Sequence, residues 1–133
     1  MKRKILIVED NVGLSQIQKD WLSRAGYDAV TAMSEPIARS LIRKTQFDLI
    51  LSDVRLPEGD GISLLEWLRK EKKDIPFIIT TEFVSVPDVV RTIKLGARDY
   101  LPKPVHREHL LELAEDVFHP VATVRKQERQ LFR

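Results

Sequence analysis

Acidic, hydroxyl and amino side chains follow several short apolar segments of this chain. Glu9 and Asp10 come directly after one apolar segment, and Asp53 comes directly after another. Thr81 closes a third segment, and Lys103 follows a fourth. Carboxylates that converge repel one another unless a cation joins them, and oxygen ligands with room for water suit Mg²⁺. These residues therefore predict a Mg²⁺ site with a lysine and a threonine beside it, if the fold brings them together.

Each of these residues taken alone has a simpler interpretation. An acidic pair after a strand most often belongs to a solvated loop or caps a helix, and an isolated threonine is typical of a strand. A single lysine is usually a surface residue. Their joint placement at the ends of successive strands favours one common site.

The apolar segments and the stretches between them indicate alternating strands and helices. Short, continuous apolar runs are typical of buried strands, and we expect five of them, over residues 5–8, 27–33, 47–52, 77–81 and 100–101. Apolar residues three and four apart indicate helices, which we expect over residues 14–25, 37–42, 62–68, 89–93 and 110–118.

The predicted helices have recognisable starts and ends. Ser34 and Ser85 each precede a proline by two residues, which is typical of an N-cap followed by proline in the first turn. Gly26 and Gly96 are suited to end the helices before them. Alternating strands and helices with short connections predict an α/β fold of three layers around a parallel sheet. In such folds the carboxyl ends of the strands border the functional crevice, so the chemical residues above should meet there.

Composition excludes several classes of protein. The 133 residues suit one domain, and no apolar run approaches the length of a membrane-spanning helix, so we expect a soluble cytoplasmic protein without membrane contact. The absence of cysteine excludes disulfides and thiolate metal sites. Residues 119–133 hold four basic residues and one acidic residue, whereas the remaining 118 residues hold 18 basic and 19 acidic residues. With nearly equal numbers of basic and acidic residues, residues 1–118 offer no broad positive face, so we expect no direct nucleic-acid binding.

Three segments closely resemble the receiver domain of two-component response regulators. They are residues 5–11 (ILIVEDN), 53–61 (DVRLPEGDG) and 96–104 (GARDYLPKP), and the resemblance extends over roughly residues 4–118. The body resembles the amino-terminal receivers of nitrogen-regulator-type transcription activators. The resemblance implies a flavodoxin-like, doubly wound sheet of five parallel strands in the order 2-1-3-4-5. It also implies a receiver domain over 1–118, with 119–133 as a basic linker or the start of a linker helix.

The resemblance implies a role for each acidic residue. Asp53 would accept a phosphoryl group from a sensor histidine kinase or a phosphotransfer protein. Mg²⁺ would be bound by Asp10, by Glu9 directly or through water, by Asp53, and by the backbone carbonyl of Arg55.

The resemblance also assigns the remaining site residues. Lys103 would pair with the phosphoryl oxygens, and its bond to Pro104 would be cis. Thr81 would be the switch hydroxyl, with Thr80 as the alternative because neighbouring strand residues face opposite sides. Tyr100 would be the switch aromatic. Glu82 occupies a position that is usually small in this family.

The implied function is a signalling switch with Mg²⁺-dependent self-phosphorylation and self-dephosphorylation, and not an enzyme acting on a separate substrate. An aspartate-nucleophile phosphohydrolase is one alternative, but it needs an acid where this chain has Arg55. An interaction module with a decayed site is another, and it is disfavoured because every pocket position is filled. A further domain would then control transcription.

The predicted output surface consists of the fourth helix, fifth strand and fifth helix. It carries both signs of charge, which would allow a homodimer with reciprocal contacts. The charged residues are Arg91, Lys94, Arg98, Asp99, Glu108 and Glu112.

Overall fold

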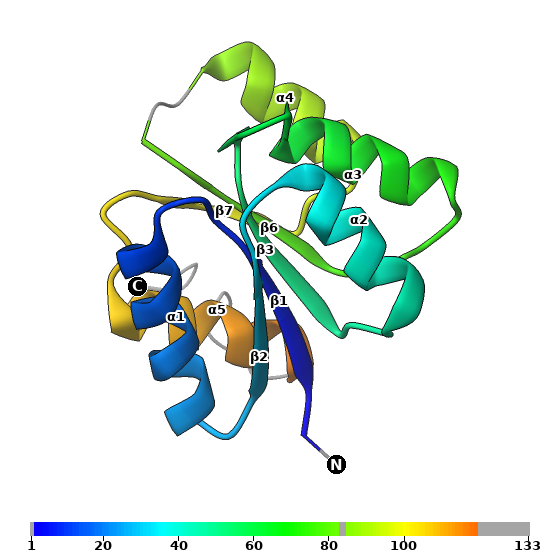
Figure 1. The fold of residues 1–133 in the computed structure, drawn as a ribbon. Coiled ribbons are helices and arrows are strands. Elements are labelled where there is room, and N and C mark those ends of the chain that lie inside the picture. The colour runs from blue at the N-terminus through cyan, green and yellow to red at the C-terminus, as the bar shows by residue number, and fades with distance from the viewer. Residues whose placement is uncertain (1, 83–84, 120–133) are drawn as a thin grey trace.

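A five-stranded parallel sheet forms the centre of the protein in a computed structural model, which describes residues 2–82 and 85–119 (Figure 1). The strands lie in the order β2-β1-β3-β6-β7, and every neighbouring pair is parallel. Counted along the chain, these five strands have the predicted order 2-1-3-4-5, so the predicted sheet is confirmed. Their bounds are β1 Lys4–Val8, β2 Asp28–Ala32, β3 Leu49–Asp53, β6 Phe77–Thr81 and β7 Asp99–Pro102.

Helices cover both faces of this sheet, as Figure 1 shows. Two of them, α1 (Val12–Arg24) and α5 (Arg107–Phe118), lie on one face. The other face carries α2 (Glu35–Lys44), α3 (Gly61–Lys70) and α4 (Val86–Lys94). None of the helices in the described ranges is long and apolar enough to cross a membrane.

The two faces of the sheet have separate cores because successive strand residues point to opposite sides. In β1, Leu6 and Val8 pack with residues of α2 and α3, whereas Ile5 and Ile7 pack with residues of α1 and α5. All four side chains are almost fully buried. The continuous apolar run that predicted this strand is therefore the consequence of burial on both faces.

The predicted helix boundaries agree with the backbone. The Ser34 hydroxyl accepts a hydrogen bond from the Ile37 amide at the start of α2, and the Ser85 hydroxyl does the same for the Asp88 amide in α4. Gly96 follows the end of α4 with φ +85°, a conformation that favours glycine. The two serine caps stabilise the first turns of α2 and α4. Within the predicted linker over 119–133, residues 120–133 lie outside the described part of the chain.

A small hairpin between β3 and α3 was not predicted. It pairs β4 (Arg55–Leu56) with β5 (Gly59–Asp60) in antiparallel fashion. The sequence indicated only a turn here, because strands of two residues are too short to show an alternating pattern. The strand β3 also ends one residue later than expected and includes Asp53 itself. Asp53 is thus held by the sheet before the chain enters the hairpin.

Arg69, near the carboxyl end of α3, forms hydrogen bonds with two loops. Its guanidinium donates hydrogen bonds to the carbonyls of Lys73 and Ile75 in the loop before β6. It also donates to the carbonyls of Leu95 and Gly96 after α4. One side chain therefore anchors the carboxyl end of α4 to α3.

We expect Arg69→Ala to lower the free energy of unfolding by about 2 kcal/mol, because hydrogen bonds from a charged donor to several carbonyls are lost together. Urea denaturation measures this change. The matched control is Arg24→Ala, which removes an exposed ion pair with Asp20 and should cost less than about 0.5 kcal/mol. Equal losses in the two variants would contradict the anchoring role of Arg69.

Candidate functional site

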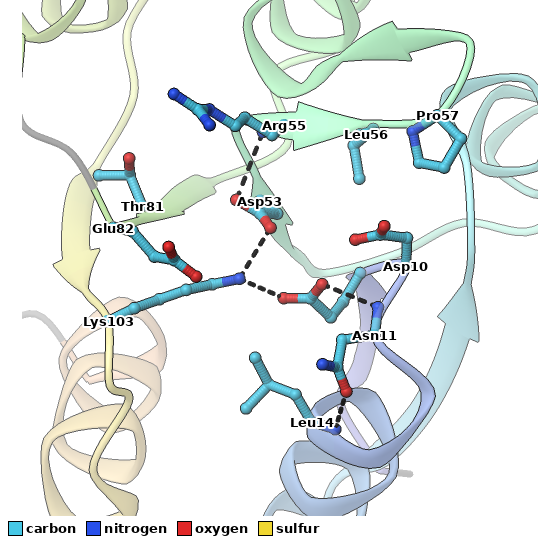
Figure 2. A pocket seen from close by; sticks show the side chains of 11 residues that line it. Asp10, Asn11, Leu14, Asp53, Arg55, Leu56, Pro57, Thr81, Glu82 and Lys103 are labelled. Atoms are coloured by element: carbon cyan, nitrogen blue, oxygen red, sulfur yellow. Dashed lines mark hydrogen bonds and ion pairs between the residues drawn. The ribbon is translucent and has the colours of Figure 1, made fainter.

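The carboxyl ends of β1, β3, β6 and β7 open onto a cavity of about 570 Å³ (Figure 2). The predicted site residues that line it are Glu9, Asp10, Asp53, Arg55, Thr81 and Lys103. Glu82 lies at the same rim. The structure thus brings together every predicted site residue except Tyr100, which lines a smaller cavity together with residues of α4.

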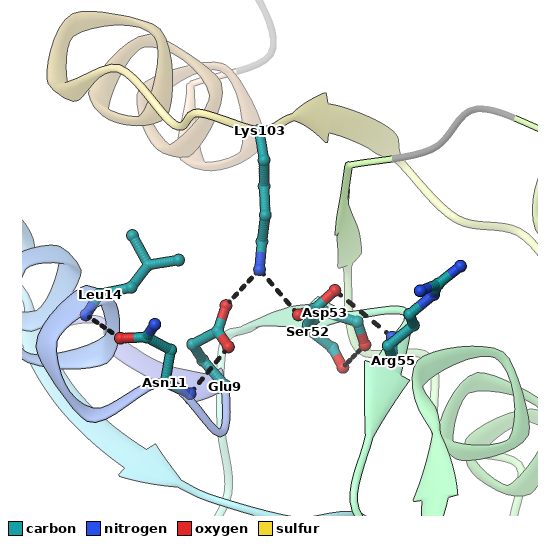
Figure 3. Close-up of polar contacts among 7 residues, drawn as sticks. All are labelled: Glu9, Asn11, Leu14, Ser52, Asp53, Arg55 and Lys103. Atoms are coloured by element: carbon teal, nitrogen blue, oxygen red, sulfur yellow. Dashed lines mark hydrogen bonds and ion pairs between the residues drawn. The ribbon is translucent and has the colours of Figure 1, made fainter.

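Lys103 is the centre of the polar contacts in this cavity. Its ammonium nitrogen lies 2.7 Å from Glu9 Oε1 and 2.7 Å from Asp53 Oδ2 (Figure 3). The three side chains are only 10%, 3% and 11% exposed, respectively. Water screens such contacts poorly, so one ammonium partly offsets the repulsion between two buried carboxylates.

Burial and the contacts between opposite charges shift the pKa values of Glu9 and Lys103 in opposite directions. Burial raises the pKa of Glu9 and the charge of Asp53 adds to that rise, although the Lys103 hydrogen bond opposes it. Burial lowers the pKa of Lys103, but its hydrogen bonds to Asp53 and Glu9 outweigh burial and leave that pKa above its ordinary value. Lys103 therefore carries a positive charge at neutral pH.

Backbone amides hold the second oxygens of the two buried carboxylates. The Asn11 amide donates to Glu9 Oε2 at 3.1 Å, and the Arg55 amide donates to Asp53 Oδ1 at 3.4 Å (Figure 3). Asn11 also caps α1 by accepting a hydrogen bond from the Leu14 amide. Sequence reasoning did not assign Asn11 a role, although an asparagine just before a helical pattern is a typical cap.

Gly61 and Ser52 support the backbone of Asp53, and sequence reasoning missed both. The Ser52 hydroxyl donates to the Asp53 carbonyl at 2.9 Å. A Cβ at Gly61 would lie only 2.3 Å from that same carbonyl oxygen, so any larger residue would displace it. The start of α3 can therefore approach the end of β3 closely only with glycine at this position.

The three acidic residues could hold a metal ion. One oxygen each of Glu9, Asp10 and Asp53 lies within 4.8 Å of the others. Against these three negative charges the described residues of the cavity wall offer the ammonium group of Lys103 and the Arg55 side chain, which is exposed at the rim. An all-oxygen donor set with excess negative charge fits a hard divalent cation.

The two adjacent threonines occupy different environments. Thr80 is buried and is paired in register with Asp53, whereas Thr81 is half-buried and lines the cavity. Thr81 also borders a smaller cavity of about 30 Å³, together with Tyr100 of β7 and residues of α4. The Tyr100 side chain is 36% exposed and is not a core aromatic. Among the described residues, Thr81 is thus the one that lines both cavities. The Lys103-Pro104 bond is cis, as expected.

Comparison with known proteins identifies the family to which this chain is similar. The family model for the response regulator receiver domain matches residues 5–115. The chain is 40% identical over 114 residues to the transcriptional regulatory protein ZraR of Salmonella typhimurium, covering 86% of this chain and 26% of that protein. It is 33% identical over 112 residues to the response regulator protein PilR of Pseudomonas aeruginosa, covering 84% and 25%. The chain thus spans about a quarter of these relatives.

Solved structures of receiver domains have a similar fold. The receiver domain of the Francisella response regulator 1452 superposes with a TM-score of 0.84 at 30% identity, covering 90% of this chain and 99% of that domain. The non-phosphorylated HemR receiver domain of Leptospira biflexa gives a TM-score of 0.83 at 36% identity, covering 89% and 95%.

We expect Lys103→Met to lower the free energy of unfolding by about 3 kcal/mol in metal-free buffer, because two buried carboxylates lose their shared cation. Chemical denaturation measures the loss, and Lys94→Met is the control at an exposed position. Adding Asp53→Asn to Lys103→Met should recover part of the stability by removing one of the repelling charges. A double variant no more stable than Lys103→Met alone would contradict this account of the cluster.

Proposed function

This chain belongs to the response regulator receiver domain family, and on that premise we propose that Asp53 accepts a phosphoryl group from a sensor histidine kinase or a phosphotransfer protein. The observation that carries the proposal is the position of Asp53. It lies at the end of the central strand, faces an open cavity, and has one oxygen held by Lys103 and the other by a backbone amide.

A carboxylate is a weak nucleophile, so the site has to act by orientation and charge. In the transfer, one Asp53 oxygen forms the new bond to phosphorus, while the bond from phosphorus to the donor breaks and the donor leaves with the electron pair. The amide of Arg55 and the ammonium of Lys103 fix the direction of the Asp53 carboxylate. Such positioning and charge neutralisation are the main contributions that a protein can make to phosphoryl transfer.

The acidic cluster fits Mg²⁺, and Glu9, Asp10, Asp53 and the carbonyl of Arg55 would hold it. When bound, Mg²⁺ would neutralise charge on the phosphoryl oxygens. Asp10 is exposed at the mouth of the cavity, whereas Glu9 and Asp53 are buried in it. A bound ion would therefore be reachable from solvent.

Phosphorylation would change the partners of Lys103 and Thr81. The new group adds roughly two negative charges and three acceptor oxygens beside Glu9. Lys103 would exchange its contact with Glu9 for a phosphoryl oxygen, and the Thr81 hydroxyl would donate to another. Because Thr81 adjoins the small cavity beside Tyr100, its movement would let the Tyr100 ring turn inward and change the surface over α4 and β7.

Two alternative functions are less well supported. A phosphohydrolase that uses an aspartate nucleophile needs an acid two residues later, where this chain has Arg55. Loss of the phosphoryl group to water would then be slow self-dephosphorylation. A module without chemistry would not need a buried lysine between two carboxylates, an arrangement that costs desolvation free energy.

The output of the switch would be control of transcription through a further domain, in the cytoplasm. Relatives named as transcriptional regulatory proteins are about four times as long as the matched region, which supports this assignment. The receiver itself would not contact nucleic acid.

The surface over α4, β7 and α5 would transmit the signal by forming a homodimer. Val90 and Ile93 of α4 are 44% and 64% exposed although both are large and apolar. The same helix carries Asp88, Arg91 and Lys94, but Arg91 already forms an ion pair with Glu66 of α3. Lys94 is therefore a better candidate than Arg91 for a contact with a second copy.

We expect incubation with Mg²⁺ and a small acyl phosphate to add one phosphoryl group, seen as a mass increase. Asp53→Asn should remain unlabelled because it removes the nucleophile, and Asp10→Ala should label more slowly because it removes a metal ligand. Asp74→Asn, at an exposed acid near the opposite end of the sheet, is the matched control and should label like wild type. Labelling of Asp53→Asn to the wild-type extent would reject the assignment.

We expect beryllofluoride with Mg²⁺, which mimics the phosphoryl group, to shift the protein from monomer to dimer in sedimentation. Lys94→Glu should weaken the dimer through lost charge pairing, and Lys44→Glu, an exposed lysine on α2, should not. Thr81→Ala should reduce the shift while Mg²⁺ still binds. A protein that binds the mimic and stays monomeric at high concentration would show that this surface serves another partner.

A further inference from the structure

The β4–β5 hairpin connects the proposed phosphoacceptor to α3 and carries one of the proposed metal ligands. Arg55 is in its first strand and pairs in register with Asp60, while Leu56 pairs with Gly59. The Gly61 amide donates to the Val54 carbonyl at 2.8 Å and closes the base of the hairpin. Because only the Leu56–Gly59 pair separates Arg55 from the turn, a displacement of Gly59 would also displace the Arg55 carbonyl.

Gly59 of this hairpin lies directly against the side chain of Glu35, the first residue of α2. A Cβ placed on Gly59 would lie 2.3 Å from Glu35 Oε2 and 3.0 Å from Glu35 Cβ. Gly59 also has φ +141°, which side chains rarely allow. Backbone and carboxylate therefore meet directly, and glycine at position 59 makes this approach possible.

Glu35 is fixed in place from its other side. Its side chain is buried, at 6% exposure for the residue, and its Oε1 accepts a hydrogen bond from Arg39 at 3.2 Å. The Arg39 guanidinium lies 5.2 Å from the centre of the Trp67 ring in α3. The carboxylate also lies in the first turn of α2, where the helix dipole favours negative charge. Glu35 is therefore a rigid support between α2 and the hairpin.

We propose that Glu35 is a positioning residue for the metal site, which sets the place of the Arg55 carbonyl through its contact with Gly59. The inference rests on the proposed function, because it assigns that carbonyl to Mg²⁺. Glu35 itself does not line the cavity and would not touch the ion. Groups that orient metal ligands from outside the ligand set strongly affect metal affinity.

The test is titration of the ¹⁵N-labelled protein with Mg²⁺ alone, followed by the amide signals of Asp53 and Arg55. Glu35→Ala removes the support, and Gly59→Ala forces the hairpin and Glu35 apart. Each should weaken Mg²⁺ binding by about tenfold in the folded protein. Glu35→Gln keeps the shape of the side chain and should bind Mg²⁺ almost as well as wild type.

Ser34→Ala is the matched control, because it removes the cap of the same helix without touching the hairpin. It should lower the stability of the protein and leave Mg²⁺ affinity unchanged. Wild-type affinity in folded Glu35→Ala and Gly59→Ala, or an equal loss in Ser34→Ala, would overturn the inference. Because one variant changes α2 and the other the hairpin, either one suffices if the other fails to fold.

Failure of the inference can be separated from failure of the proposed function. If wild type binds Mg²⁺ and all variants bind it equally, only the role of Glu35 is rejected. Phosphorylation of Asp53→Asn would reject the acceptor assignment whatever the variants at Glu35 and Gly59 show. If wild type binds no Mg²⁺, both the metal site and its positioning by Glu35 are rejected.

Discussion

The contact of one lysine with two buried carboxylates is the constraint on which the rest of this structure depends. Lys103 meets Glu9 and Asp53 across 94 and 50 residues of sequence, respectively. The parallel sheet places the carboxyl ends of β1, β3 and β7 at one edge and so brings these side chains together. Partial neutralisation leaves an excess of negative charge, and that excess makes the cavity suited to a divalent cation and a phosphoryl group.

The same cluster explains how a local reaction could change a distant surface. Thr81 at the end of β6 and Lys103 just after β7 line one cavity, and Thr81 also borders the cavity beside Tyr100. A new anion at Asp53 would compete with Glu9 for Lys103 and would attract the Thr81 hydroxyl. In the described residues, α4 buries only Thr92 almost completely, while its carboxyl end is anchored through Arg69. This helix could therefore respond at its amino end without unfolding the domain.

Much of the fold, and the gathering of the site residues at one edge of the sheet, could be predicted from the sequence for identifiable physical reasons. Buried parallel strands need continuous apolar runs, and a polar residue at the end of such a run marks the edge of the sheet, as Asp53 does. The supports could not be predicted, because they depend on three-dimensional proximity. Glu35 has the sequence appearance of an ordinary acidic residue in a first helical turn, and only the fold places it against Gly59. Arg69 likewise gives no sequence signal for its bonds to two loops.

The most direct test of the account is a crystal structure with Mg²⁺ and beryllofluoride bound. The account predicts beryllofluoride on Asp53, with the Lys103 ammonium and the Thr81 hydroxyl in contact with its fluorine atoms and with the contact from Lys103 to Glu9 broken. A structure in which beryllofluoride sits elsewhere, or in which Lys103 keeps both carboxylates while Asp53 carries the mimic, would contradict it.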